Sequence, residues 1–240
     1  LILNPIGYYM HYDPSPIMVM QPTIQMAETF SKDRLSPMLR DTPVLRDKVN
    51  DKSRNSGNTI LQKIFPGGHV TMVGANSPSS LASRPIRILL ADEIDRYPAT
   101  AGNEGDPLLL AGKRLATFWN KKEVCVSTPT NKETSRIAVE FEHSTQEEWN
   151  VPCPACGAFT PLLWANIVFD RDKLDEIGCT CPACGVVSSE TEWKEQYING
   201  KFVAAHPERK VRGFHLNALA SLFVDWREIV EKFLTANEEK

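Results

Sequence analysis

The stretch ILLADEID, residues Ile88 to Asp95, decides the fold that the sequence predicts. It opens with four apolar residues and ends in acids. An apolar run of this length predicts a buried parallel strand rather than a half-exposed one. Open α/β sheets bind ligands at the carboxyl ends of their strands, and Asp92 and Glu93 lie at that end. Two carboxylates there are costly unless they hold a cation or accept a proton.

The order of apolar residues followed by Asp-Glu is the Walker B pattern of nucleotide-hydrolysing motors. In such a site Asp92 would hold the Mg²⁺ of a Mg-nucleotide, directly or through water. Glu93 would orient and deprotonate the attacking water. The alternative for this motif by itself is a strand that runs into a solvated acidic turn.

The composition is that of an ordinary globular protein. With 240 residues, 42% hydrophobic and 24% charged, the chain fits one large domain or one domain plus a small one. The formal net charge of −3 gives no overall basic signature, so nucleic-acid binding would need a local patch. No apolar run approaches the about 18 residues of a transmembrane helix, and no signal-peptide order is present. Because the first residue is not Met, we expect the chain to be a fragment.

Strands that alternate with helices predict a mainly parallel sheet. Thr23 and Asp106 are well placed to cap helices that follow them. Strands are predicted at residues 17–20, from Arg87 and at 123–127, and a hairpin at 59–73. Helices are predicted at residues 1–12, from 24, from 108 to Trp119, at 132–143, from 190 and from 226.

Four of the six cysteines form two Cys-Pro-Ala-Cys-Gly repeats, with 24 residues between the pairs. Such a repeat folds tightly enough for two thiolates to take adjacent corners of a tetrahedron. Gly157 and Gly185 follow directly, where a positive φ angle is often needed. Cys179 is expected to be a bystander, and Cys125 to be buried in its strand. The alternative to a metal site is that the two cysteine pairs are reduced structural or redox pairs. The ligands predicted for a structural zinc ion are Cys153, Cys156, Cys181 and Cys184.

Three polar segments follow predicted strands: Gln21-Pro22-Thr23, Asp92-Glu93 and Ser127-Thr128-Pro129-Thr130. RecA-like motors, which are P-loop NTPases, carry three such elements in this order. The last one lies beside the nucleotide and can report its γ-phosphate, so Ser127 and Thr128 are candidate nucleotide-binding residues. Each segment is weak evidence alone, because strand ends commonly carry such capping residues. No G-x-x-x-x-G-K-[ST] loop is present, and we expect that loop upstream of Leu1.

Several short phrases run through almost the whole chain in order, which makes them together more specific than any single motif. They are residues 4–9, 21–23, 74–81, 83–85, 92–98, 104–107, 113–114 and 127–130, both cysteine repeats, and 213–215. Through these phrases the chain resembles the large terminase subunit of tailed bacteriophages, of the lambda-like type.

The resemblance implies a motor that couples ATP hydrolysis to pumping viral DNA into a procapsid, and a separate metal-dependent nuclease domain. It implies ATP, Mg²⁺ and structural Zn²⁺ as cofactors. The implied partners are double-stranded DNA, the small terminase subunit, the portal and procapsid, and further copies in a ring, with no membrane. The implied location is the host cytoplasm. Because the Walker A loop and the nuclease domain are missing, we expect these 240 residues alone to be inactive.

The resemblance also suggests roles for basic residues. Arg84 lies nine residues before Glu93. Ring-forming motors place an arginine near there to stabilise γ-phosphate charge, in a neighbouring subunit's site or their own. A surface arginine paired with an acid is the alternative. Candidates for contacts with DNA phosphates, or for a solvated polar face, are Arg40, Arg46, Lys48, Lys52 and Arg54.

We therefore expect an α/β, RecA-like ATPase core with a mainly parallel sheet flanked by helices over residues 1–147. A small Cys₄ zinc ribbon follows over 148–188, and a return segment over 189–240 packs on the core and leads toward a nuclease domain. Two other functions stay open. A DEAD-type helicase would need a second motor domain, and a non-enzymatic zinc-ribbon DNA-binding module would not respond to alanine at Glu93.

Overall fold

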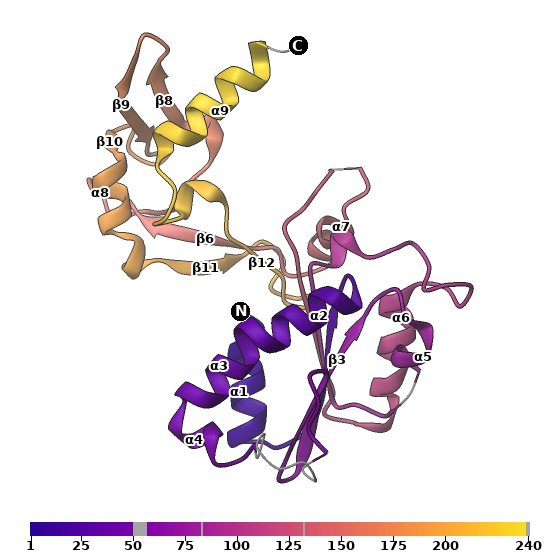
Figure 1. The fold of residues 1–240 in the computed structure, drawn as a ribbon. Coiled ribbons are helices and arrows are strands. Elements are labelled where there is room, and N and C mark those ends of the chain that lie inside the picture. The colour runs from indigo at the N-terminus through magenta and orange to yellow at the C-terminus, as the bar shows by residue number, and fades with distance from the viewer. Residues whose placement is uncertain (50–56, 83, 132, 239–240) are drawn as a thin grey trace. The chain divides into compact units, whose positions relative to one another are not determined.

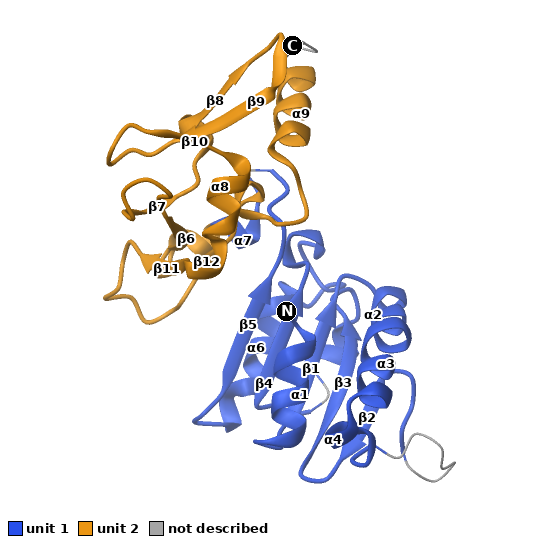
Figure 2. Ribbon diagram, turned by 90° about the vertical axis from the view of Figure 1, so that its left-hand side faces the viewer, with its two compact units in different colours: residues 1–138 blue, residues 139–240 orange. Residues whose placement is uncertain are grey.

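The computed structural model describes residues 1–49, 57–82, 84–131 and 133–238. The chain divides into two compact units, residues 1–138 and 139–240 (Figure 2). Lys52 and Arg54, two of the candidate DNA contacts, and Ser83 of the matching phrases lie outside the described residues. In the described ranges, no helix has both the length and the apolar character that crossing a bilayer takes.

The first unit is built on one five-stranded sheet with strand order β2-β3-β1-β4-β5. Strands β3, β1, β4 and β5 are parallel, and only β2 pairs antiparallel, in a hairpin with β3. This arrangement confirms the predicted mainly parallel sheet and the predicted hairpin. The strands are β1 (Pro16–Gln21), β2 (Gln62–Phe65), β3 (Gly68–Gly74), β4 (Ile88–Asp92) and β5 (Lys122–Val126).

Helices cover both faces of this sheet. In Figure 1, α1 to α4 lie on one face and α5 and α6 on the other. The helices are α1 (Leu3–His11), α2 (Ile24–Phe30), α3 (Ser36–Asp41), α4 (Pro43–Arg46), α5 (Pro78–Leu81), α6 (Pro107–Gly112) and α7 (Arg136–Glu142).

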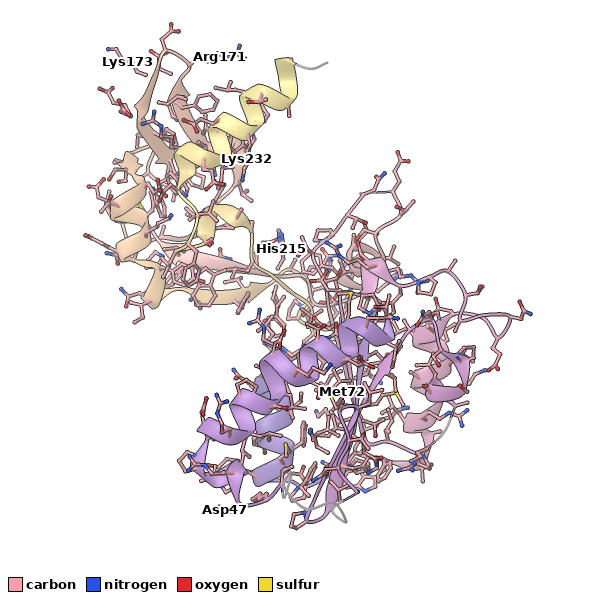
Figure 3. The ribbon with its side chains drawn as sticks, viewed as in Figure 1. Asp47, Met72, Arg171, Lys173, His215 and Lys232 are labelled. Atoms are coloured by element: carbon pink, nitrogen blue, oxygen red, sulfur yellow. The ribbon has the colours of Figure 1, made fainter. Side chains whose placement is uncertain are left out.

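Each face has its own hydrophobic core, because successive side chains of a strand point to opposite faces. Ile17, Leu90 and Met72 (Figure 3) pack under α1 to α4. Met18 and Leu89 pack against α5 and α6 on the other face. Strand β4 is buried on both sides, which explains why its sequence is an unbroken apolar run.

Both predicted helix caps are confirmed. The Thr23 side chain accepts a hydrogen bond from Met26 N at 3.2 Å, and Asp106 accepts from the amides at the start of α6. Helix α2 runs through a π-helical turn, Ser31–Leu35, into α3.

The predicted helix from residue 108 to Trp119 is wrong at its end. Helix α6 stops at Gly112 and continues as a 3₁₀ turn, Lys113–Thr117. Trp119 lies in the turn that follows this 3₁₀ segment, outside any helix, and it is 94% exposed. The helix predicted at 132–143 is also shorter, since α7 begins at Arg136; residue 132 lies outside the described residues.

The second unit contains two small sheets. One has the order β10-β9-β8, and the other the order β11-β6-β12, with β7 also paired to β6. Figure 3 labels His215 in β12 and Lys173 at the start of β9. The strands are β6 (Glu147–Pro152), β7 (Phe159–Pro161), β8 (Ile167–Asp170), β9 (Lys173–Thr180), β10 (Val187–Ser189), β11 (Lys201–Ala204) and β12 (Phe214–His215). The helices are α8 (Glu190–Glu195) and α9 (Trp226–Glu238).

Two fully buried tryptophans organise the core of this unit. Trp193 Nε1 donates to the carbonyl of Cys179 at 3.1 Å, and Trp226 Nε1 donates to the carbonyl of Leu219 at 2.8 Å. These residues share one core with the strands that carry the cysteine repeats. Residues 189–240 thus contribute both tryptophans to this core, and the packing of this segment on the ATPase core stays a prediction.

Candidate nucleotide site and metal centre

The three polar segments predicted from the sequence meet at the carboxyl ends of the strands of the first sheet. Gln21 and Asp92 are the last residues of β1 and β4, which are parallel neighbours, and Ser127 follows β5. Gln21 Nε2 donates to Asp92 Oδ2 at 3.0 Å, and Gln21 is only 3% exposed. The buried amide of Gln21 thus orients one oxygen of Asp92 at the strand end.

Glu93 has a left-handed backbone, with φ 56° and ψ 46°. This conformation costs a non-glycine residue roughly 1–2 kcal/mol, and such strain collects at functional sites. The Glu93 carboxylate forms an ion pair with Arg96, with Oε2 3.2 Å from Nε. The Arg96 side chain is 64% exposed and that of Glu93 is 34% exposed, so this pair is weak and can open.

Two buried side chains, Ile94 and Tyr97, anchor the turn after Glu93. The Tyr97 hydroxyl donates to the carbonyl of Met20 at 3.0 Å, in the neighbouring strand β1. Burial raises the pKa of Tyr97, and the nearby Cys125 and Asp92 raise it further. The hydroxyl therefore stays protonated and acts as a donor.

Asp95 connects this turn to the segment after β5. Its Oδ2 accepts from Thr130 N at 2.9 Å and from Thr130 Oγ1 at 3.2 Å, and its Oδ1 accepts from Ile137 N at 2.8 Å. Its own amide donates to Ser127 Oγ at 3.2 Å. Burial would raise the pKa of Asp95, but the hydrogen bonds from Ser135, Ile137 and Thr130 outweigh it and lower that pKa. Asp95 lies in the quoted motif, but the sequence pattern predicted no role for it.

Arg136 ties the start of α7 to the loop after the motif. Its guanidinium pairs with Asp106, the residue that caps α6, and Nη2 donates to the carbonyl of Pro98 at 3.1 Å. Together with Asp95, this arginine anchors the first turn of α7 within the first unit.

The candidate nucleotide-binding residues Ser127 and Thr128 lie beside the Asp92–Glu93 turn. Ser127 Oγ accepts from Asp95 N and lies 3.3 Å from the carbonyl of Thr128, and the Thr128 side chain is exposed. Their contact with a nucleotide stays a prediction.

Arg84 lies at the opposite end of β4 from the two carboxylates. It precedes Ile88, the first residue of the strand, whereas Glu93 follows the last. Burial lowers the pKa of His69 at the start of β3, and the charge of Arg84 lowers it further, so Arg84 lies at the amino ends of the strands. The strand between them spans roughly 13 Å at about 3.3 Å per residue. A role for Arg84 at a γ-phosphate stays a prediction, and it is open only for a neighbouring subunit's site.

The described candidates for DNA contact make local contacts. Arg40 pairs with Asp41, with Nε 2.8 Å from Oδ1. Arg46 Nε donates to the carbonyl of Arg40 at 2.8 Å, and Lys48 Nζ lies 3.4 Å from the carbonyl of His11. Their contact with DNA stays a prediction.

The four cysteines of the two repeats come together in the second unit, as predicted. Their Sγ atoms all lie within 4.8 Å of one another. The pairs Cys153–Cys184 and Cys156–Cys181 are each 3.9 Å apart. Zinc–sulfur bonds of about 2.3 Å in a tetrahedron place two sulfurs about 3.8 Å apart, so the cluster has the size for one zinc ion.

The local backbone also fits a metal. Gly157 and Gly185 have φ of 72° and 77°, which confirms the positive φ expected after each repeat. Burial opposes ionisation of Cys181, but backbone N–H groups of Cys184 and Ala183 outweigh it and lower its pKa to about 7. Four thiolates leave no open coordination position, so the arrangement fits a structural ion and not a catalytic one.

Cys179 and Cys125 are not among the four clustered cysteines. Burial, with the neighbouring thiols Cys181 and Cys153, raises the pKa of Cys179 to about 11, so it stays a thiol. Cys125 is only partly buried, because its strand β5 is an edge of the described sheet.

The family described as "Phage terminase large subunit gpA, ATPase domain" matches residues 1–202. The chain belongs to this family. The resemblance drawn from the sequence is thereby confirmed, and the helicase alternative is not supported. The match extends over the first unit and over all four clustered cysteines.

Individual relatives agree with the family. The large terminase subunit of Enterobacteria phage P21 is 23% identical over 263 aligned residues, which cover 98% of this chain and 41% of that protein. The large terminase subunit of Escherichia phage lambda is 26% identical over 65% of this chain and 25% of that protein. The chain thus spans less than half the length of these relatives. Among solved structures, the Thermus phage P74-26 large terminase ATPase domain has a TM-score of 0.41 and 12% identity, covering 96% of this chain and 73% of that one.

Proposed function

We propose that this chain is the ATPase portion of a phage large terminase subunit, which uses ATP hydrolysis to move double-stranded DNA into a procapsid. The observation that carries the proposal is the paired carboxylate at the end of β4, where Asp92 is oriented by Gln21 and Glu93 has a strained backbone. Membership of an ATPase-domain family supports it.

In this proposal the strand-end residues divide the work on ATP. Asp92 is the residue that would hold Mg²⁺, and the ion would neutralise phosphate charge. Glu93 accepts the proton of the attacking water, for which it must leave Arg96. Ser127 and Thr128 would contact the γ-phosphate, and Arg84 would serve the site of a neighbouring copy in a ring.

We further propose a structural Zn²⁺ held by Cys153, Cys156, Cys181 and Cys184. The proposed division is an ATPase core over residues 1–147, a zinc ribbon over 148–188 and a return segment over 189–240. The compact units divide nearby, after Ala138.

The charge distribution supports DNA contact through the first unit. That unit carries 17 Lys and Arg against 13 Asp and Glu, whereas the second carries 10 against 17. A local excess of positive charge is the footprint of a DNA-binding surface. The small terminase subunit, the portal and procapsid are the other partners of this proposal, and the host cytoplasm is its location, because the relatives are phage proteins.

Substitution of Glu93 tests the proposal in the complete gene product that carries these residues. Glu93→Gln keeps the shape of the side chain but removes the base. We expect ATP turnover to fall roughly 10²–10⁴-fold, because a positioned base contributes that much, while the Kd of Mg-ATP stays nearly unchanged. Asp92→Asn should also weaken Mg-dependent binding.

Steady-state ATPase rates and equilibrium nucleotide binding measure the two effects separately. Glu104→Gln is the matched control, because Glu104 is an exposed acid in the loop before α6. If Glu93→Gln keeps most of its turnover, the acidic strand end is only a solvated turn and the proposal is wrong.

A further inference from the structure

We propose that Asp95 is a positioning residue that couples the nucleotide site to helix α7, a proposal that rests on the ATPase function above. Each oxygen of its carboxylate holds a different segment. Oδ2 binds the backbone and hydroxyl of Thr130, and Oδ1 binds the amide of Ile137 in the first turn of α7.

Asp95 also holds the other end of the segment after β5. Its amide donates to Ser127 Oγ at 3.2 Å, so Ser127 and Thr130 are both fixed by one residue. Asp95 lies two positions after Glu93, in the 3₁₀ turn Ile94–Arg96. A shift of this turn, when Glu93 leaves Arg96 to act on a bound nucleotide, therefore moves Thr130 and α7 or breaks their hydrogen bonds.

Helix α7 is the element that such a shift would move. It begins at Arg136 in the first unit and ends at Glu142, beyond the division after Ala138. Ile137 packs partly buried against the core under α5 and α6. The first turn of α7 is thus connected through Asp95 to the Glu93 turn, and its last turn belongs to the second unit.

A helix cap alone would not need this arrangement. A capping aspartate uses its oxygens on the N–H groups of one helix, whereas Asp95 divides them between a loop and a helix. Only an ionised carboxylate offers acceptors in both directions. An asparagine would turn an N–H₂ donor toward the amide of Thr130 or Ile137, and two donors cannot pair.

The test uses the complete gene product with Asp95→Asn, Thr130→Val and Thr130→Ser. Thr130→Val removes only the hydroxyl, and Thr130→Ser keeps it. Asp33→Asn is the matched control, since it makes the same charge change at an exposed residue of the same unit. The measurements are the Kd of Mg-ATP, the ATP turnover rate, and the length of DNA moved per ATP hydrolysed.

We expect Asp95→Asn to lower the DNA moved per ATP by about tenfold or more, because losing a hydrogen bond to a charged group shifts an equilibrium by about that factor. The Kd of Mg-ATP should change by no more than about twofold. Thr130→Val should follow Asp95→Asn in direction, and Thr130→Ser and Asp33→Asn should behave as the wild type. Hydrogen exchange of residues 127–138 should depend on the nucleotide in the wild type and lose that dependence in Asp95→Asn.

Two results would overturn the inference. One is a normal yield of DNA moved per ATP in both Asp95→Asn and Thr130→Val. The other is a loss of Mg-ATP affinity as large as the loss of DNA movement, which would make Asp95 a purely structural residue. If Asp95→Asn does not fold, the Val and Ser variants at Thr130 still decide. The Glu93→Gln result tests ATP hydrolysis itself, so failure of the two proposals can be told apart.

Discussion

Glu93 and its neighbours show how single residues in one short motif have different tasks. Asp92 faces Gln21 at the strand end, and Glu93 takes a backbone conformation that few non-glycine residues adopt. Tyr97 then binds the carbonyl of Met20 in β1. The hydroxyl of Tyr97 therefore fixes where the turn stands relative to the sheet, and with it the direction of the Glu93 side chain.

Tyr97→Phe tests this anchor at the scale of one atom. It leaves the ring in place and removes the hydroxyl, so the hydrogen bond to the carbonyl of Met20 is lost. We expect the free energy of unfolding of the first unit to fall by about 0.5–1.5 kcal/mol, the net contribution of one hydrogen bond. Denaturant unfolding measures it. Tyr12→Phe, at an exposed tyrosine of the same unit, should have no effect. Equal stability of the two variants would contradict the anchor.

At the scale of elements, the short strand β12 is held to β6 by side chains as well as by backbone pairing. It contains only two residues, with Phe214 opposite Glu147. The Glu147 side chain is 5% exposed and accepts two hydrogen bonds from Arg212, at 2.8 and 2.7 Å. Arg212 also lies over the ring of Phe214, 4.7 Å from its centroid. Arg212 therefore links strand β12 to its neighbour β6.

This ion pair predicts a pH dependence for the stability of the second unit. The Arg212 guanidinium lowers the pKa of Glu147 below its ordinary value of 4.5, so the unfolded chain binds more protons than the folded one in the range between. The stabilisation is fully present above the ordinary glutamate pKa and is lost as pH falls through the lower folded pKa.

Glu147→Gln should remove this contribution, so its free energy of unfolding should fall less steeply than that of the wild type from about pH 5 to about pH 3. Denaturant unfolding of both proteins across that range measures the difference. Glu208→Gln, at an exposed acid of the same unit, should keep the wild-type slope. Parallel pH profiles for wild type and Glu147→Gln would show that Arg212 contributes nothing.

At the scale of the whole molecule, the two units have separate cores and opposite charge. The first is a sheet with helices on both faces, and the second is built around two tryptophans and four clustered cysteines. A large sheet can bury enough apolar surface to be stable by itself, whereas small domains often need a metal ion.

Metal removal should therefore affect the two units differently. A strong zinc chelator, or Cys153→Ser, should lower the melting temperature of the second unit and leave that of the first unchanged, because structural zinc contributes folding energy directly. Differential scanning calorimetry with metal analysis measures both, with about one zinc per chain expected. Cys125→Ser is the control and should leave the zinc content unchanged, because Cys125 is not one of the four clustered cysteines. A metal-free protein with both units fully folded would contradict the proposed zinc centre.

Features that depend on neighbours in the chain were predictable. The unbroken apolar run predicted the buried strand β4, Thr23 predicted a helix start, and the spacing of the cysteines predicted their cluster. Gly157 and Gly185 were predicted to have positive φ, and they do. In each case a local pattern of spacing or backbone chemistry carries the information.

Features that depend on distant partners were not predictable from the sequence. Asp95 was quoted as part of a motif, but its partners Thr130 and Ile137 lie 35 and 42 residues further along the chain. Arg84 is close to Glu93 in sequence yet stands at the other end of β4, since an extended strand separates them. Trp119 was expected within the helix from residue 108, but α6 ends at Gly112 and the 3₁₀ segment at Thr117, so Trp119 lies outside both and is exposed.

The sequence by itself determined the parallel α/β sheet, the acidic strand end and the cysteine cluster, since hydrophobic period and ligand spacing are local properties. The tertiary structure decided which side chains the strand end uses: Gln21 for Asp92, Arg96 for Glu93, and Thr130 with Ile137 for Asp95. The physical reason is that parallel strands bring their carboxyl ends to one edge whatever their distance in the chain. The hydrogen bonds made there depend on register and turn geometry, which no local pattern contains.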